Sequence, residues 1–511
     1  MLRLRSYLAD HRPTAIVTWL GLFFLLFYLA GARGTMSFGD DISMLAVTES
    51  IATKGSVAVA PETPGATAGL EGRYYSKYGL GQSLLGVPFY LVGAYLQNHL
   101  AKPNTYLNPN ADPITYWVCL LGIFSGVGAV VFLYLSCTEL GFGERASIIA
   151  TIAFGACTFE WFYARTFMTE VPSTFFMIAA FYAMLRVRDT MLAKWLWWSG
   201  FSLGLAALVR LQNGVMLLVF GMWLLCELWI WHRYDLKKRL VSMVAWLAPI
   251  VASLITIAAY NFVRFGTLTD VGLEGHAGPP VSQNPTRLGF YVYLANIVGL
   301  QSHSGPGLFK SEFYAPLFGL LLGSGKGIFW YAPILIPAVY GWSFFWKKCP
   351  GVAGILGVLV ASNLLFYSFF STWWGGGVWG PRFMVQTLPF LMIGLAALID
   401  HGLGLVGWIV VGATAALSLF IQIASILISY IPYEGLMERT SDSFDDLLWN
   451  PAYSPIIEQS RYLIHHQYPF DLAYNAYPAR YMAGFQFLAL LASVAVLGIG
   501  VKLFLDGKQQ A

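Results

Sequence analysis

Long runs of apolar residues recur along the whole chain, and they limit the folds open to it. A helix needs roughly 20 apolar residues to cross the hydrocarbon core of a bilayer. Of the 511 residues, 57% are hydrophobic and only 11% are charged, which is far from the balance of a soluble protein. We therefore expect an all-α polytopic membrane protein with about 12 transmembrane helices. The runs lie near residues 14–31, 113–136, 146–161, 170–186, 195–209, 213–231, 240–262, 327–346, 351–371, 382–399, 403–430 and 481–503.

A further apolar segment, Leu84 to Leu96, decides the topology. It contains Pro88 and Gly93 and is short for a span. If it lies along the outer face without crossing, the basic connections and both termini share one side, which the positive-inside rule makes cytoplasmic. We adopt this arrangement, which leaves the cell-envelope side to the long loops. The cytoplasmic connections are then Arg186 to Lys194, His232 to Arg239, and Lys347 to Lys348.

The expected organisation has three parts. Residues 1–430 form the transmembrane core, which includes a first outer loop over residues 32–112. Residues 431–480 form an extracytoplasmic loop or lid, and residues 481–511 form the last transmembrane helix and a cytoplasmic tail. Because the outer loops are long and polar, we expect amphipathic helices lying over the membrane mouth. The basic and apolar start could be a cleavable signal peptide, but we expect a retained signal anchor.

Several classes of protein find no support in the sequence. A net charge of +4, spread over short loops, gives no reason to expect a nucleic-acid partner. The five cysteines and the scattered histidines lack metal-ligand spacing, so we predict no metal site from them. The stretch Gly323 to Gly327 contains a lysine, but its glycine spacing differs from that of a phosphate-binding loop and no Ser or Thr follows Lys326.

Two adjacent acids, Asp40 and Asp41, follow the first apolar run at the point where the chain reaches water. A carboxylate in that place can act as a general base if it reaches an acceptor hydroxyl and is not neutralised by a permanent ion pair. The alternative is that one of them only caps the helix that follows. A third acid, Glu170, begins a later span, where the helix dipole also favours it.

Basic and aromatic residues on the same side could bind a phosphate. Arg382 stands at a helix start behind a glycine-rich turn, where a planar guanidinium and free amides can grip an anion. An interfacial aromatic belt with a snorkelling arginine is the alternative reading of this stretch. The candidate cations are Arg73, Lys77, Arg165, Arg210, Lys326 and Arg382, and the neighbouring aromatic residues are Tyr75, Tyr78, Trp373 and Trp374.

These blocks resemble glycosyltransferases of the GT-C superfamily, near the family 39 group of protein O-mannosyltransferases and lipid A aminoarabinose transferases. That group carries an Asp-Glu pair, a helix ending in glycine and an aromatic-Lys-Pro-Pro stretch. Here the corresponding residues are Asp40 and Asp41, Gly55, and the stretch Tyr75 to Gly79. The second acid is Asp instead of Glu, Tyr-Gly replaces Pro-Pro, and Glu170 stands where Asp is usual. The blocks Gly327 to Pro333 and Trp373 to Pro389 resemble bacterial relatives.

The resemblance implies an inverting glycosyltransferase that moves a sugar from a polyprenyl-phosphate donor to an envelope lipid, glycan or protein at the extracytoplasmic membrane face. Under that reading Asp40 is the base and Asp41 positions the acceptor or replaces Asp40. Lys77, Arg165, Arg382 and Arg73 would bind the donor phosphate. The residues expected to contact substrate are Glu170, Tyr75, Tyr78, Trp373 and Trp374.

Cofactors and rival functions complete these expectations. Because lysine and arginine can neutralise a monophosphate, we expect no required cofactor, although Asp40, Asp41 and Glu170 could hold a divalent metal if they converged. The location expected is a multi-pass inner membrane with both termini cytoplasmic. A secondary transporter, a lipid-linked glycan flippase and a polymerase remain alternatives, but transporters usually carry ionisable groups near the midplane, and here such groups gather at helix ends.

Overall fold

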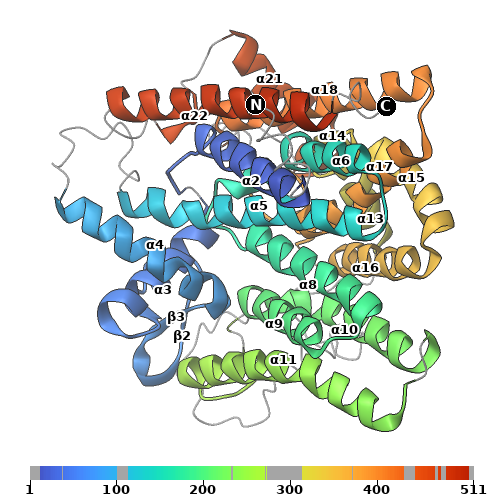
Figure 1. Cartoon of the computed structure of the whole chain (residues 1–511). Coiled ribbons are helices and arrows are strands. Elements are labelled where there is room, and N and C mark those ends of the chain that lie inside the picture. The colour runs from blue at the N-terminus through green and yellow to red at the C-terminus, as the bar shows by residue number, and fades with distance from the viewer. Residues whose placement is uncertain are drawn as a thin grey trace.

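The computed structural model describes residues 12–36, 38–99, 113–231, 234–270, 272, 313–370, 372–430, 444–465, 470–473 and 479–505. Helices dominate these residues, as the sequence predicts (Figure 1). In the first half they are α2 (Arg12–Ala30), α3 (Gly39–Lys54), α4 (Leu80–His99), α5 (Pro113–Glu139), α6 (Glu144–Cys157), α7 (Glu160–Ala164), α8 (Glu170–Thr190), α9 (Ala193–Val209), α10 (Gly214–Leu225) and α11 (Leu236–Phe265).

The second half continues with shorter helices between the long ones. They are α13 (Tyr314–Leu322), α14 (Ile328–Tyr331), α15 (Leu335–Lys348), α16 (Pro350–Phe369), α17 (Leu388–His401), α18 (Leu405–Leu427), α20 (Phe444–Trp449), α21 (Pro455–His465) and α22 (Ala479–Gly500). Single turns of tighter or wider helix are η1 (Leu70–Gly72), η2 (Leu211–Asn213), η3 (Cys226–Trp231), η4 (Arg382–Thr387), η5 (Pro451–Tyr453) and η7 (Val501–Leu505).

Nine helices in the described part of the chain are long and apolar enough to cross a membrane. The chain is thus a multi-pass membrane protein, while the predicted number of 12 stays a prediction. Three predicted spans are short here, because α6 has 14 residues, α9 has 17 and α15 has 14. The nine are Arg12–Ala30, Pro113–Glu139, Glu170–Thr190, Leu211–Trp231, Leu236–Phe265, Pro350–Phe369, Arg382–His401, Leu405–Leu427 and Met482–Phe504.

The helices divide into a buried centre and an apolar periphery. The apolar windows of α8 and of the η4–α17 span are 83% and 94% buried, whereas those of α11 and α22 are only 22% and 17% buried. Figure 1 shows α5 and α8 in the middle, with α11 along one margin and α22 along the other. A helix that is apolar but largely uncovered suits contact with lipid chains.

The first outer loop holds a small sheet that the sequence analysis did not anticipate. Strands β1 (Ala58–Val59), β3 (Tyr74–Ser76) and β2 (Ala66–Ala68) pair antiparallel in the order β1-β3-β2. The sheet lies against the end of α11, where the Arg264 guanidinium donates a hydrogen bond to the Ser76 carbonyl oxygen. At Gly69 any side chain would collide with the Arg264 backbone, since an added Cβ would lie 2.3 Å from its carbonyl oxygen. The loop thus contains the helix α3 and, in addition, three short strands.

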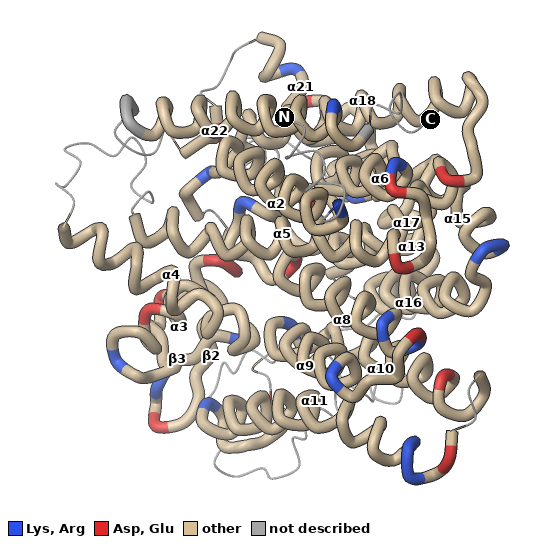
Figure 2. Tube along the Cα trace, in the orientation of Figure 1, with Lys and Arg blue, Asp and Glu red and all other residues tan. Residues whose placement is uncertain are grey.

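Charged residues collect near the ends of the long helices, as Figure 2 shows. At the end opposite α3, Arg12 binds Glu144 at 2.6 Å, and Arg186 binds Glu139 at 3.0 Å. Lys348 joins the same end through the Gly141 carbonyl oxygen. These contacts tie together the starts of α2 and α6 and the ends of α5, α8 and α15.

The three-part division of the chain stays a prediction. Within the predicted lid of residues 431–480, residues 431–443, 466–469 and 474–478 lie outside the described residues. The same is true of residues 273–312 and of both chain ends. The described part of the lid packs on the core, because Gln459 on α21 donates a hydrogen bond to the Ile428 carbonyl oxygen at 2.7 Å.

Candidate active site

Helix α3 presents the two adjacent acids in its first turn. Its N-cap is Phe38, which makes no side-chain hydrogen bond to the helix, and Asp40 and Asp41 follow directly. Neither acid therefore occupies the cap position that was the alternative interpretation. Carboxylates in the first turn are still favoured by the helix dipole. The helix ends at Gly55, whose left-handed backbone (φ 60°) suits a residue without a side chain.

The carboxylate of Asp40 is held from both sides. The Tyr78 hydroxyl donates to its Oδ1 at 2.5 Å, and Nη1 of Arg382 donates to its Oδ2 at 2.7 Å. The side chains of Asp40 and Arg382 remain 26% and 14% exposed, so the pair is accessible from outside. Three residues proposed separately from the sequence thus meet, although Arg382 lies 342 positions after Asp40.

The charge state of Asp40 follows from this setting. Burial raises the pKa of Asp40. This effect is outweighed by the positive charge of Arg382, by the hydrogen bonds from Tyr78 and Arg382 and by the charge of Lys77, all of which lower the pKa. The net pKa of Asp40 is below its ordinary value, so the carboxylate is ionised at neutral pH. Burial and the nearby Asp40 charge raise the pKa of Tyr78, which keeps its hydroxyl protonated as a donor.

The surroundings of Asp41 shift its pKa in the opposite direction. Its side chain is buried, with 1% of the residue exposed, and burial followed by the Asp40 charge raises its pKa well above the ordinary value. Among the described residues its Oδ1 has no hydrogen-bond partner. Adjacent carboxyl groups whose surroundings move their pKa values apart can take different roles. Here Asp40 is the ionised one of the two.

The turn before η4 fixes the position of Arg382. Gly375 has a left-handed backbone (φ 82°), and a Cβ there would lie 2.9 Å from Cγ of Arg382. The ammonium of Lys326 donates hydrogen bonds to the carbonyl oxygens of Gly376 and Val378, and these bonds stabilise the turn. The glycines and the lysine therefore shape the turn that carries the guanidinium.

A second buried ion pair lies beside the first. Nη1 of Arg210 donates to Oε1 of Glu170 at 2.9 Å, and both residues are buried. The Arg210 guanidinium carbon lies 4.9 Å from the centre of the Phe383 ring, and that of Arg382 lies 5.0 Å from the same ring. Glu170 therefore lies near the Asp40 pair, and its substrate role stays a prediction. Arg210 was one of the candidate cations in the sequence but was assigned no role in the site; a charge at the end of an apolar run is the signal that marks it.

Two buried oxygen atoms around these pairs have no hydrogen-bond partner in the described part of the chain. They are Oε2 of Glu170 and Oδ1 of Asn213. A buried acceptor without a donor costs about 1–3 kcal/mol, so such atoms are rare unless another molecule supplies the donor. The interior beside Arg382 is thus suited to accept hydrogen bonds from hydroxyl or amino groups.

Arg165 has other contacts than those expected of a phosphate ligand. Its guanidinium donates to Oδ2 of Asp471 at 2.9 Å, to the Ile426 carbonyl at 2.8 Å and to the Asp471 carbonyl at 2.9 Å. Arg33 donates to Oδ1 of the same aspartate at 3.0 Å. These contacts join the segment after α2, the end of α18 and the segment before α22. Among the described residues no contact joins Arg165 to Asp40, and the phosphate role of Arg165 stays a prediction.

The remaining predicted residues are spread around the first loop and the tryptophan turn. Arg73 is exposed and pairs with Glu71 at 3.2 Å. Tyr75 is buried in β3. Lys77 is exposed, and its ammonium lies 5.4 Å from the centre of the Tyr78 ring. Its positive charge helps to lower the pKa of Asp40. The rings of Trp373 and Trp374 lie 6.1 Å apart, with Trp373 buried and Trp374 partly buried.

The described residues give no group of three or more His, Cys, Asp or Glu side chains that could hold a metal ion. Asp40, Asp41 and Glu170 therefore do not form such a group, because Arg382 and Arg210 take two of the three acids. The expectation that no cofactor is required stays a prediction.

A family model described as dolichyl-phosphate-mannose-protein mannosyltransferase matches residues 76–269. The resemblance to GT-C glycosyltransferases is confirmed there. The matched segment contains Lys77, Tyr78, Glu170 and Arg210, while Asp40 precedes it and reaches it through the Tyr78 hydrogen bond. No curated protein sequence is significantly similar to this chain.

The solved structures to which the chain is similar include proteins of a bacterium, a yeast and an archaeon. ArnT from Cupriavidus metallidurans, bound to undecaprenyl phosphate, is 14% identical, with 96% of this chain and 75% of that chain covered and a TM-score of 0.46. The S. cerevisiae protein O-mannosyltransferase Pmt1-Pmt2 complex, bound to the sugar donor, is 17% identical, with coverage of 50% and 34% and a TM-score of 0.39. The Archaeoglobus fulgidus oligosaccharyltransferase is 12% identical, with coverage of 89% and 56% and a TM-score of 0.48.

Proposed function

We propose that the chain is an inverting glycosyltransferase that moves a sugar from a polyprenyl-phosphate donor to an acceptor hydroxyl at a membrane surface. The observation that carries the proposal is the ionised Asp40 carboxylate, held by Arg382 and Tyr78 beside Lys77. A base and two cations in one accessible place match the needs of the reaction. The family model that matches residues 76–269 is named for a lipid-phosphate-linked mannose donor, which supports the donor class.

In the proposed step the acceptor oxygen attacks the anomeric carbon of the sugar while Asp40 removes the hydroxyl proton. The bond between the anomeric carbon and the phosphate oxygen breaks, and the lipid phosphate leaves with the electron pair. Arg382 and Lys77 stabilise the charge that develops on the leaving oxygen. Attack from the face opposite the phosphate inverts the anomeric centre. The acceptor is an envelope lipid, glycan or protein.

The ion pair between Asp40 and Arg382 requires an exchange of partners during this cycle. A base neutralised by a permanent pair would be a poor proton acceptor. A lipid-linked phosphate competes for the same guanidinium, because arginine binds phosphate oxygens with two parallel hydrogen bonds. Once Arg382 binds the donor, Asp40 keeps only its bond from Tyr78 and faces the acceptor. Donor binding thus generates the active base.

We further propose that this site faces the cell envelope, with both termini in the cytoplasm. The end of the bundle opposite α3 carries Arg12, Arg186 and Lys348, together with the short basic connections. Basic short loops favour the cytoplasmic side. The site then lies where a lipid-linked sugar and an envelope acceptor meet.

A required metal ion is not part of the proposal. Arg382 and Lys77 would supply the positive charge for the phosphate, and transfer is expected to continue in the presence of EDTA. Loss of transfer in EDTA that returns on adding one divalent metal would overturn this part of the proposal.

The substitution Asp40→Asn tests the proposed function. We expect sugar transfer from a purified polyprenyl-phosphate sugar to fall about 10²–10⁴-fold, as for the loss of a general base. Expression and donor binding should persist. Glu71→Gln is the matched control, since it removes an exposed acid of the same loop that pairs only with Arg73 in the described residues. Full turnover by Asp40→Asn would reject Asp40 as the base.

A further inference from the structure

Helices α9 and α11 pack closely and run in the same direction. A Cβ added at Gly200 would lie 2.0 Å from the Trp246 carbonyl oxygen, and one added at Gly204 would lie 2.5 Å from Oγ of Ser253. The two glycines, four positions apart, bring the backbones together over successive turns. Early residues of α9 thus lie beside early residues of α11.

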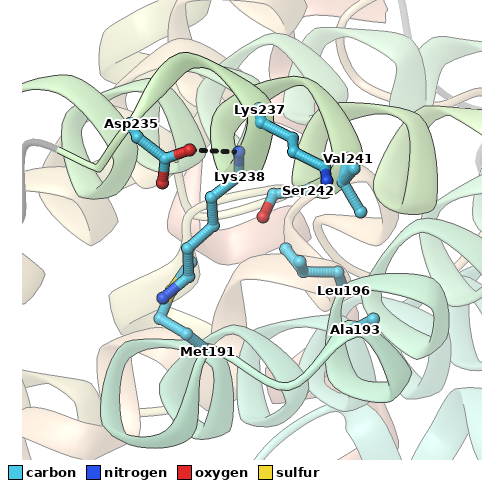
Figure 3. Close-up of a pocket in the computed structure, with 8 residues that line it drawn as sticks. All are labelled: Met191, Ala193, Leu196, Asp235, Lys237, Lys238, Val241 and Ser242. Atoms are coloured by element: carbon cyan, nitrogen blue, oxygen red, sulfur yellow. Dashed lines mark hydrogen bonds between the residues drawn. The ribbon is translucent and has the colours of Figure 1, made fainter.

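A pocket of about 290 Å³ opens between the starts of these helices (Figure 3). Figure 3 shows Lys238 reaching from α11 toward Met191, while the side chain of Lys237 turns toward Val241. Two lysines and one aspartate line this pocket. The Lys238 ammonium lies 3.7 Å from the centre of the Tyr234 ring, and Asp235 accepts a hydrogen bond from the Lys238 amide at 3.4 Å. The mouth of the pocket therefore offers more positive than negative charge.

Farther along the same two helices lies a second hollow of about 450 Å³. Apart from Ser253 and Thr256 its lining is apolar, and the rings of Trp197 and Phe201 stack with centres 4.9 Å apart. The exposed fraction of Trp197 is 42%. The lining residues are Trp197, Phe201, Leu205, Leu208, Ala248, Pro249, Ala252, Ser253 and Thr256.

The two hollows lie on the same side of the helix pair. The α11 residues of both linings follow the helical repeat of 3.6 residues and form one stripe, Lys238, Val241, Ala248, Ala252 and Thr256. On α9 the first pocket is lined by Ala193 and Leu196, and the second hollow by Trp197, Phe201, Leu205 and Leu208. A charged mouth therefore leads into an apolar groove, which we name the α9–α11 groove.

We propose that the α9–α11 groove binds an anionic phospholipid of the surrounding bilayer, with its phosphate at Lys237 and Lys238 and one acyl chain along the apolar stripe. Basic pockets between transmembrane helices suit anionic head groups, and each lysine near such a surface contributes to binding. The order of charge followed by apolar surface matches the order of head group and chain in a lipid. Met191 lines the mouth in a left-handed backbone (φ 49°), where α8 ends.

The groove is separate from the proposed sugar-transfer site. Helix α11 has 30 residues, which corresponds to about 45 Å. Its first turns line the charged mouth, whereas Arg264 at its other end contacts Ser76 in the first outer loop. The lipid bound there is thus a component of the opposite leaflet from the proposed donor, and the inference does not depend on the proposed function.

Native mass spectrometry of the full-length protein can test the lipid site. The protein is delipidated and supplied with equal amounts of phosphatidylglycerol and phosphatidylcholine that carry the same acyl chains. We expect the wild type to retain phosphatidylglycerol in preference to phosphatidylcholine. In the double variant Lys237→Gln/Lys238→Gln the ratio of the two retained lipids should fall about tenfold. The variant Ala252→Phe, which fills the apolar groove, should lower retention of the lipid while both lysines remain.

A matched control removes two positive charges from the same end of the bundle. The double variant Lys347→Gln/Lys502→Gln alters exposed lysines outside the groove, and its preference for phosphatidylglycerol should equal that of the wild type. An unchanged preference in Lys237→Gln/Lys238→Gln would overturn the proposal. An equal loss in both double variants would also overturn it, since general surface charge would then account for retention.

Discussion

Replacing Asp40 with asparagine should make the protein bind polyprenyl phosphate more tightly than the wild type does. In the structure Oδ2 of Asp40 lies 2.7 Å from Nη1 of Arg382 and forms an ion pair with it. An incoming phosphate must therefore displace the carboxylate. An asparagine keeps the size of the side chain and its bond to Tyr78, but it removes the charge that competes for Arg382.

The size of this gain follows from the pair that is lost. A hydrogen bond between charged groups contributes about 1.5–3 kcal/mol. Because 26% of the Asp40 side chain is exposed, solvent screening places this pair in the lower half of that range, at about 1.5–2 kcal/mol. Each 1.4 kcal/mol corresponds to a factor of ten in Kd, so we expect the variant to bind about 10–30-fold more tightly.

The assay is a titration of purified protein in lipid nanodiscs with polyprenyl phosphate, followed by thermophoresis or calorimetry. The control Glu71→Gln removes one negative charge from the same loop without touching Arg382, and its Kd should stay within about twofold of the wild type. Equal or weaker binding by Asp40→Asn would refute the exchange of partners, because the carboxylate would then not compete with the donor.

Further predictions concern pH, the second cation and the buried arginines. Since Arg382 leaves Asp40 when the donor binds, the pKa of Asp40 should rise in the complex. The acidic limb of the pH profile of kcat should therefore lie at higher pH than the acidic limb of kcat/KM. Limbs that coincide would contradict this. In donor titrations Lys77→Ala should weaken binding about tenfold and Arg73→Ala less than twofold, because Arg73 is exposed and already paired; equal effects would remove the special role of Lys77. Asp471→Asn should destabilise the fold by about 3–5 kcal/mol, because it leaves two buried guanidinium groups without their carboxylate; an unchanged Tm in thermal unfolding would argue against that account.

The sequence predicted the parts of the site that depend on local signals. Asp40 and Asp41 were recognisable as paired acids just beyond an apolar run, and Arg382 as a cation behind a glycine turn. Their meeting was an expectation from topology, since both were assigned to the same membrane face. The contact between Asp40 and Arg382 agrees with that expectation.

The parts that sequence reasoning missed depend on long-range packing. Arg165 was expected at a phosphate, but its partner Asp471 lies 306 positions later in a segment with no distinguishing pattern. Arg210 pairs with Glu170 only because η2 folds against the start of α8. The three short strands were also missed, because runs of two or three residues carry no usable alternation. The pairings of Arg165 and Arg210 depend on how separate segments pack, which no local pattern in the sequence encodes.

The shared aspartate of Arg33 and Arg165 also bears on biogenesis. Both arginines enter the membrane region early in synthesis, yet their carboxylate belongs to residue 471. Until that residue is synthesised, the two buried guanidinium groups have no counter-charge from it. Docking of the segment around Asp471 is therefore a late assembly step, and a nascent chain halted before that point would leave both arginines without their carboxylate.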